Sequence, residues 1–220
     1  MKKTLISLFT LIGSLALSPA AWSQDVKADI AAGEGKAAMC IGCHGIPGYQ
    51  SSFPEVHKVP MISGQDGKYL VSALNAYAKG ERKHPTMRAV AASLSAQDIA
   101  DLSAYYEQHA KAPAAPEAVS DAPPKKVAEL LQKGACAGCH GANYSKPLVP
   151  GSPKIAGQHA DYLYVALKSY TVTGNPQVGR NNAIMSGVAK QFTREELRLM
   201  ADYLATLPGE TRVMPQSRFR

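Results

Sequence analysis

Cysteine is scarce in this chain of 220 residues, and all four cysteines fall in two short stretches, Cys40–His44 and Cys136–His140. No cysteine is left over to build a further metal cluster elsewhere in the chain. Long apolar runs are equally rare, because beyond the N-terminus none approaches the ~20 residues that a membrane-spanning helix needs. Alternating apolar and polar residues, the pattern of a half-buried strand, never continue over a convincing length. These absences argue against a membrane-embedded bundle and a β-rich fold.

Both cysteine stretches follow the pattern Cys-x-x-Cys-His, which is typical of the attachment of a c-type haem. Each thiol can form a thioether with a vinyl group of the porphyrin, and the adjoining His44 or His140 can ligate the iron. A thioredoxin-like dithiol would not need the histidine, and a zinc site would combine both halves in one tetrahedral cluster. Two complete copies favour two covalently attached haem c groups. The attachment residues are then Cys40, Cys43, Cys136 and Cys139.

The N-terminal segment has the layout of a secretory signal peptide. Two lysines are followed by an apolar stretch from Leu5 to Leu17 and by small residues that offer a cleavage site after Ser23. The apolar stretch is short for a membrane anchor, so we expect residues 1–23 to be removed on export. Because c-type haem is attached outside the cytoplasm in bacteria, the motifs and the signal together predict a periplasmic protein.

The mature chain divides into two similar halves. A Pro/Ala-rich linker at residues 112–124 separates a first domain, residues 24–111, from a second domain, residues 125–220. In each half the cysteine motif precedes Pro-x-Ile-x-Gly-Gln, then a Tyr-Leu pair, and then a methionine followed by Val-Ala. The same order of features in both halves predicts an internal duplication.

Each unit is predicted to be helical with long loops. Short helices should lead into the motifs over residues 29–39 and 125–134, and the apolar positions of residues 66–79 share one helical face. The last helix of each unit should begin at a capping box, Ser95–Asp98 or Thr193–Glu196. The fold class is therefore all-α, with two small domains each wrapped around one haem. A unit of this size buries a thin core, so haem insertion should be coupled to folding.

The second axial ligand of each iron decides what the haem can do. A methionine gives a closed electron-transfer site of high potential, whereas an open position allows chemistry on a small molecule. Met87 and Met185 lie at matched positions, 43 and 45 residues beyond their histidines, in predicted irregular loops. They are the predicted distal ligands. Met61 is matched by Lys154 in the other half, and His84, which could replace Met87 in a bis-His site, has no matching histidine.

Residues near the motifs suggest supporting contacts. The carbonyl oxygens of Pro60 and Pro153 are natural acceptors for the Nδ1–H of His44 and His140, a contact that would fix each ring and raise its basicity. Two matched pairs could donate to the haem propionates, although a tyrosine on a helix face is as often part of the core. These pairs are Gln65 with Gln158 and Tyr69 with Tyr162.

Together these motifs resemble the cytochrome c4 family, periplasmic dihaem class I c-type cytochromes with two similar domains. The resemblance covers nearly the whole mature chain and rests on Cys-x-x-Cys-His-Gly, Pro-x-Ile-x-Gly-Gln with Tyr-Leu, and Met-x-x-Val-Ala in both halves. It implies a single-electron carrier from a quinol–cytochrome c reductase to a haem–copper terminal oxidase, loosely attached to the membrane in some members. It also implies His/Met ligation of both irons, by His44 with Met87 and by His140 with Met185.

Three functions compete for this sequence. The leading hypothesis is a mobile electron carrier that binds redox proteins, has no affinity for nucleic acid and transforms no substrate. The alternative is a dihaem cytochrome subunit of a periplasmic dehydrogenase, such as a flavoprotein sulfide dehydrogenase, because similar dihaem modules serve there. A dihaem peroxidase would need an iron able to bind peroxide, and the methionines at both matched positions argue against it. We therefore expect an electron-transfer protein rather than an enzyme.

Overall fold

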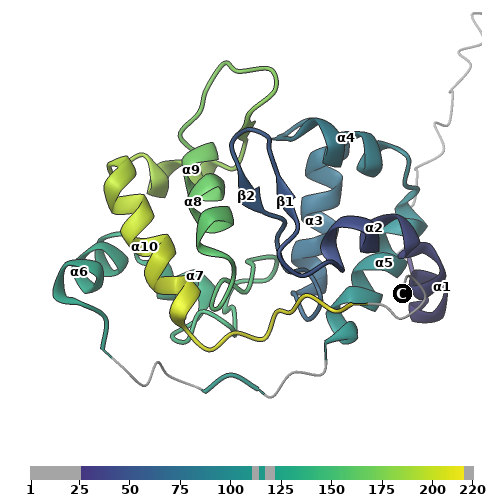
Figure 1. Cartoon of the computed structure of the whole chain (residues 1–220), viewed down its shortest axis with the longest axis horizontal. Helices are drawn as coiled ribbons and strands as arrows, with labels where there is room; N and C mark the ends of the chain where they lie inside the picture. Colours follow the sequence, from purple (N-terminus) through teal and green to yellow (C-terminus); the bar gives the residue numbers. More distant parts are fainter. Residues whose placement is uncertain (1–25, 111–113, 117–121, 216–220) are drawn as a thin grey trace, which may run out of the picture.

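The computed structural model describes residues 26–110, 114–116 and 122–215. The predicted signal peptide, residues 1–23, and part of the predicted linker lie outside these ranges. Figure 1 shows two groups of helices side by side, the first half in purple to teal and the second in teal-green to yellow. No helix within the described ranges is long and apolar enough to cross a membrane.

The two halves repeat one order of helices. The first half contains α1 (Ile30–Lys36), α2 (Ala38–His44), α3 (Gly67–Ala78), α4 (Pro85–Ala92) and α5 (Ala96–His109). The second half contains α6 (Lys125–Lys133), α7 (Cys136–His140), α8 (Ala160–Ser169), α9 (Ala183–Ala189) and α10 (Arg194–Thr206). Four two-residue strands complete the described elements: β1 (Gln50–Ser51), β2 (His57–Lys58), β3 (Arg82–Lys83) and β4 (Gly179–Arg180). The all-α prediction is confirmed.

The helix starts follow local sequence signals. Both predicted capping boxes are present, with Ser95 and Asp98 exchanging hydrogen bonds at the start of α5 and Thr193 and Glu196 at the start of α10. A reciprocal pair of this kind satisfies two of the amide groups that a helix N-terminus leaves without partners. The single helix expected over residues 29–39 is instead two, because α1 ends at Lys36 and α2, which carries the first motif, begins at Ala38.

The prediction that Met87 and Met185 lie in irregular loops is wrong. Met87 lies in the first turn of α4 and Met185 in the first turn of α9. Each helix begins because a side chain accepts the methionine amide: His84 caps α4 and Asn182 caps α9. Pro85 follows His84 at the first helical position, where a missing amide hydrogen costs nothing.

Each half has its own apolar core. The cluster in the first half is built on α2, α3 and α5, and the larger cluster in the second half is built on α6, α8 and α10. In the first half α1 crosses α5 at Gly33, where an added Cβ would lie 2.2 Å from the carbonyl oxygen of Asp101. Only glycine allows this close approach, which brings α1 onto the core.

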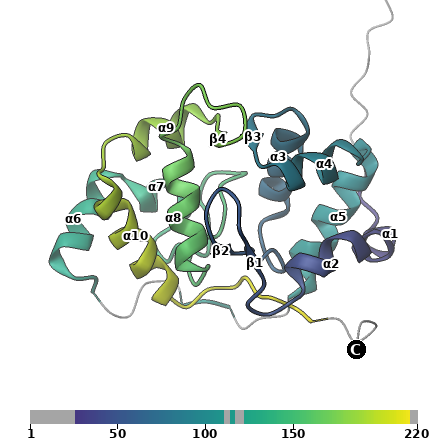
Figure 2. The same cartoon turned by 45° about the horizontal axis from the view of Figure 1, so that its top comes forward.

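Backbone pairing joins the two halves. Strands β3 and β4, one from each half, pair antiparallel with Arg82 opposite Arg180, and Figure 2 shows them meeting between the two groups of helices. The chain after α10 then returns to the first half, seen as the yellow segment in Figure 1. There the amide of Arg212 donates to the carbonyl oxygen of Ser63 at 2.9 Å. The halves are therefore held in a defined arrangement.

Candidate haem sites

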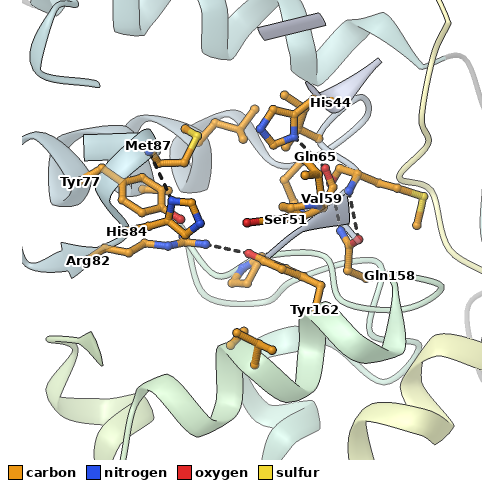
Figure 3. A pocket seen from close by; sticks show the side chains of 18 of the residues that line it. His44, Ser51, Val59, Gln65, Tyr77, Arg82, His84, Met87, Gln158 and Tyr162 are labelled. Carbon is orange, nitrogen blue, oxygen red and sulfur yellow. Dashed lines mark hydrogen bonds between the residues drawn. The ribbon is translucent and has the colours of Figure 1, made fainter. Parts of the chain in front are cut away.

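A cavity of about 450 Å³ is lined by residues of both halves. Figure 3 looks into it, with His44 and Met87 on one side and Arg82 and Tyr162 on the other. The lining also includes the second half's predicted ligands, His140 and Met185, and the cysteines of the first motif. The cysteines of the second motif do not line the cavity; Cys136 packs against the second apolar core.

The two motif histidines are held in one tautomer. Nδ1 of His44 lies 2.8 Å from the carbonyl oxygen of Pro60, and Nδ1 of His140 lies 2.9 Å from that of Pro153. A carbonyl oxygen only accepts, so each Nδ1 carries the proton and each Nε2 keeps a lone pair for a metal. Burial lowers the pKa of both imidazoles, which favours the neutral form that ligates iron. The predicted proline contacts are confirmed.

Among the described residues the cysteines do not gather into a zinc cluster, and the surroundings of Cys40 and Cys136 do not favour a reactive dithiol. Burial raises the pKa of the Cys40 thiol to about 11 and also raises the pKa of Cys136, whereas a redox-active thiol needs a lowered pKa. Over the described ranges, no group of three or more His, Cys, Asp or Glu side chains could hold a metal ion. Attachment to a porphyrin remains the chemistry that fits these thiols.

The cavity lining also suits a haem, which has a flat apolar body and two carboxylates. Leu74 and Val90 are among the aliphatic side chains of the first half that line it, and Leu167 is among those of the second. Nε of Arg82 and Oγ of Ser103 are among the buried polar atoms of the lining that have no hydrogen-bond partner among the described residues. Buried donors without partners are costly, so these atoms suit a polar group of a ligand.

The predicted methionine ligands are half-buried in the same cavity as the histidines. His84 accepts the Met87 amide through Nδ1 at 3.4 Å, and Asn182 accepts the Met185 amide at 2.9 Å. His84 is therefore matched by Asn182, a different capping residue, in the second half. This is why the sequence has no histidine at the position that corresponds to His84. Ligation of the irons by the two methionines stays a prediction.

Gln65 and Gln158, suggested as donors to haem propionates, bind the backbone of the opposite half. The side chain of Gln65 donates to the carbonyl oxygen of Lys154 at 2.9 Å and accepts the Lys154 amide at 2.7 Å. Gln158 makes the same two contacts with the backbone of Met61, at 2.9 and 3.0 Å. We call these four hydrogen bonds the glutamine clasp. It uses only the backbone of Met61 and Lys154, so their different side chains do not disturb the symmetry.

Sequence reasoning missed Arg82 and Arg180, which line the cavity from opposite halves. The hydroxyls of Tyr69 and Tyr162, proposed as donors to propionates, accept hydrogen bonds from Arg82 at 2.9 and 2.7 Å. The repeat contained the necessary signal, because each arginine precedes the predicted methionine ligand of its half by five residues.

Comparison with known proteins agrees with this architecture. The Cytochrome c family model matches residues 124–208. Cytochrome c4 of Pseudomonas aeruginosa is 30% identical over 94% of this chain and 100% of its own length. The thiosulfate dehydrogenase electron acceptor of Thiomonas intermedia is 27% identical over 94% of this chain and 92% of its own.

The crystal structure of reduced recombinant cytochrome c4 from Pseudomonas stutzeri superposes with a TM-score of 0.62 and 27% identity, covering 83% of this chain and all of that one. Its fold and those identities agree with the two motifs, which indicate two covalently bound haems. The chain thus belongs to the cytochrome c4 family of dihaem electron carriers.

Proposed function

We propose that this protein is a periplasmic carrier whose two His/Met-ligated haems each take up and release one electron, and that it transforms no substrate. The observation that carries the proposal is the shared cavity, in which each half supplies a histidine and a methionine. With both axial positions filled by side chains, an iron has no open site for a small molecule.

The chain's own residues set the conditions for electron transfer. Haem supplies the one-electron chemistry of its iron. Pro60 and Pro153 orient the imidazoles of His44 and His140 and raise their basicity through the Nδ1 hydrogen bonds. The aliphatic side chains of the lining, such as Leu74, Val90 and Leu167, would pack against the apolar body of a haem. Residues of both halves line one cavity, so haems held by these residues would lie beside a common space, where an electron could pass between them within the molecule.

A spectrum of the purified holoprotein tests the ligation. We expect low-spin ferric haem with a methionine-to-iron charge-transfer band, and no binding of carbon monoxide to the reduced protein. Met61→Leu is the matched control for the predicted methionine ligands and should leave this spectrum unchanged. Met61 lines the cavity, but its hydrogen bonds to Gln158 are made by its backbone. A high-spin fraction or rapid oxidation by peroxide in the natural protein would overturn the carrier proposal.

Export is tested on the same preparation. The intact mass of the mature protein should equal residues 24–220 plus two haems, and the protein should appear in the periplasmic fraction. A mass that retains residues 1–23 would contradict cleavage after Ser23, and haem-loaded protein in the cytoplasmic fraction would contradict the periplasmic location.

For the partners we propose a quinol–cytochrome c reductase as donor and a haem–copper oxidase as acceptor. A thiosulfate dehydrogenase is a second candidate donor, favoured by the relative named as the electron acceptor of such an enzyme, which matches over almost the whole chain. Stopped-flow reduction by each purified donor distinguishes the two. The physiological donor should reduce the protein orders of magnitude faster than the other, with a rate that falls as ionic strength rises if charge steers the encounter.

A further inference from the structure

The two predicted methionine ligands are not held in the same way. Nδ1 of His84 accepts the Met87 amide at 3.4 Å, a contact that Figure 3 draws in the cavity wall. Asn182 accepts the Met185 amide at 2.9 Å. A hydrogen bond of 3.4 Å is longer than the usual range, so the cap of α4 is the weaker of the two. The start of α4, which carries Met87, therefore depends on further contacts of the His84 ring.

Phe53 supplies these contacts from the turn of the hairpin that β1 and β2 form. The rings of Phe53 and His84 meet edge to face, with centroids 5.7 Å apart and planes at 84°. The imidazole also forms a hydrogen bond with the Phe53 backbone. Phe53 is itself fixed, because the Ser51 hydroxyl accepts its amide at 3.3 Å and donates to its carbonyl oxygen at 3.1 Å. The His84 ring thus joins the first turn of α4 to the hairpin.

The hairpin in turn is held by α8 of the second half. Figure 1 shows β1 and β2 between α3 and α8. The Lys58 amide on β2 donates to the Asp161 carboxylate at 3.0 Å, and Glu55 in the turn forms an ion pair with Lys168. A chain of contacts therefore runs from α8 through the hairpin and His84 to the Met87 backbone.

The second half has no counterpart of this chain. Among residues 122–215 no hairpin follows the cysteine motif, and β4 is the only strand. A methionine ligand raises the potential of a haem, so the position of its sulfur matters for electron transfer. We propose that His84 is a positioning residue, which aims the Met87 sulfur at the first iron and makes this ligand depend on the second half through the hairpin.

Variants of His84 in the holoprotein test the positioning role. His84→Ala removes both the cap and the contacts with Phe53. We expect a lower midpoint potential of the first haem and displacement of Met87 from its ferric iron by added imidazole roughly 2- to 30-fold faster, the range that loss of a helix cap gives. His84→Asn carries the capping residue of the second half but cannot reach Phe53, so it should recover only part of both changes.

The two sites are read separately by proton resonance of the reduced holoprotein. Each ligating methionine gives its own methyl signal, displaced by the ring current of its haem, and Met185→Ala assigns the pair by removing one signal. His84→Ala should move the Met87 signal and leave that of Met185 in place. His159→Ala is the matched control, because His159 also precedes a helix, α8, but its side chain makes no capping hydrogen bond and does not line the cavity.

A change in the second half tests the link through the hairpin. Lys168→Ala removes the ion pair with Glu55. It should move the Met87 methyl signal in the same direction as His84→Ala, by less, and by more than it moves the Met185 signal. Lys126→Ala is the control, since it breaks an ion pair with Glu196 that lies within the second half, at 3.4 Å. This control should leave both methyl signals unchanged.

Each outcome supports or overturns the proposal. An unchanged first-haem potential and Met87 signal in His84→Ala would make His84 a helix cap only. Complete recovery in His84→Asn, or an unmoved Met87 signal in Lys168→Ala, would remove the hairpin from the account. The inference rests on Met87 as a ligand. If the natural spectrum lacks the methionine band, the carrier proposal fails; a normal natural spectrum with unaffected variants refutes this proposal alone.

A measurement on the natural sequence covers the case in which His84→Ala does not mature. Nitrogen resonance of the holoprotein with ¹⁵N-labelled histidine reports which ring nitrogen carries the proton. We expect Nδ1 of His84 without a proton, because it accepts the Met87 amide. A proton on Nδ1 would overturn the proposal, since that nitrogen could not then accept the amide.

Discussion

Removing one half of the glutamine clasp should open the junction between the two halves. Gln65 is 3% exposed and accepts the Lys154 amide while donating to the Lys154 carbonyl oxygen. In Gln65→Ala both backbone groups of Lys154 lose their partner. A net hydrogen bond contributes about 0.5–1.5 kcal/mol, and a buried group left without a partner costs about 1–3 kcal/mol. For two groups at a junction that water can enter, we expect roughly 2–4 kcal/mol.

Native-state hydrogen exchange of the reduced holoprotein measures this loss directly. Because 1.4 kcal/mol is about a factor of ten, the Lys154 amide should exchange roughly 30- to 1,000-fold faster in Gln65→Ala. If the clasp opens as one unit, the Met61 amide, held by Gln158, should accelerate by a similar factor. Gln158→Ala should give the same pattern from the other side.

Gln191→Ala is the matched control, since among the described residues the side chain of this exposed glutamine donates only to the Gly187 carbonyl of its own half. It should leave both junction amides at their wild-type rates. An unchanged exchange rate of the Lys154 amide in Gln65→Ala would refute the reasoning, because it would mean that other contacts hold the junction closed without the clasp.

Met185→Ala should let the second iron bind carbon monoxide while the first haem keeps its spectrum; intact charge-transfer bands from both haems would contradict the assigned ligand. Gly33→Ala should lower the free energy of unfolding by about 1–3 kcal/mol, because its Cβ would lie 2.2 Å from the Asp101 carbonyl oxygen. Gly35→Ala in the same helix meets nothing within 4 Å and should raise it by up to about 1 kcal/mol in the same denaturant titration. A hydrogen bond from Lys36 lowers the pKa of Asp101. The contribution of the Asp101 carboxylate to the free energy of unfolding is therefore complete above about pH 4 and lost as pH falls further. Asp101→Asn should therefore be less stable than the natural protein at pH 6 and converge with it in acid; equal stability at pH 6 would count against this.

The features that the sequence predicted correctly are local ones. A capping box spans four residues and the Cys-x-x-Cys-His motif spans five, so both are complete within a short stretch of chain. The contact of His44 with Pro60 crosses only 16 residues and was predictable because a ligating imidazole needs an acceptor on Nδ1. In each case the chemistry of nearby residues leaves few alternatives.

The features that the sequence did not predict depend on how the halves meet. Gln65 was assigned to a haem propionate because its amide suits either partner, and only the arrangement of the halves brings the Lys154 backbone to it. The helices around Met87 and Met185 were missed although Pro85 and Asn182 are ordinary start signals, because each helix is short, eight residues for α4 and seven for α9, and offers little apolar periodicity. The paired arginines were visible in the repeat, but nothing local identified them as neighbours.

The junction also bears on how two haems with matched ligands can differ in potential. The predicted ligands and the proline acceptors are the same in both halves, so they give no reason for a difference. The asymmetry lies beside the cavity: Arg82 donates to two tyrosines whereas Arg180 donates to one, and His84 caps the first methionine helix where Asn182 caps the second. Charge and hydrogen bonding around a haem set its potential when the axial ligands are equal. These differences would therefore contribute to a difference between the two potentials, and variants of Arg82 or Arg180 should change it more than conservative changes in either core.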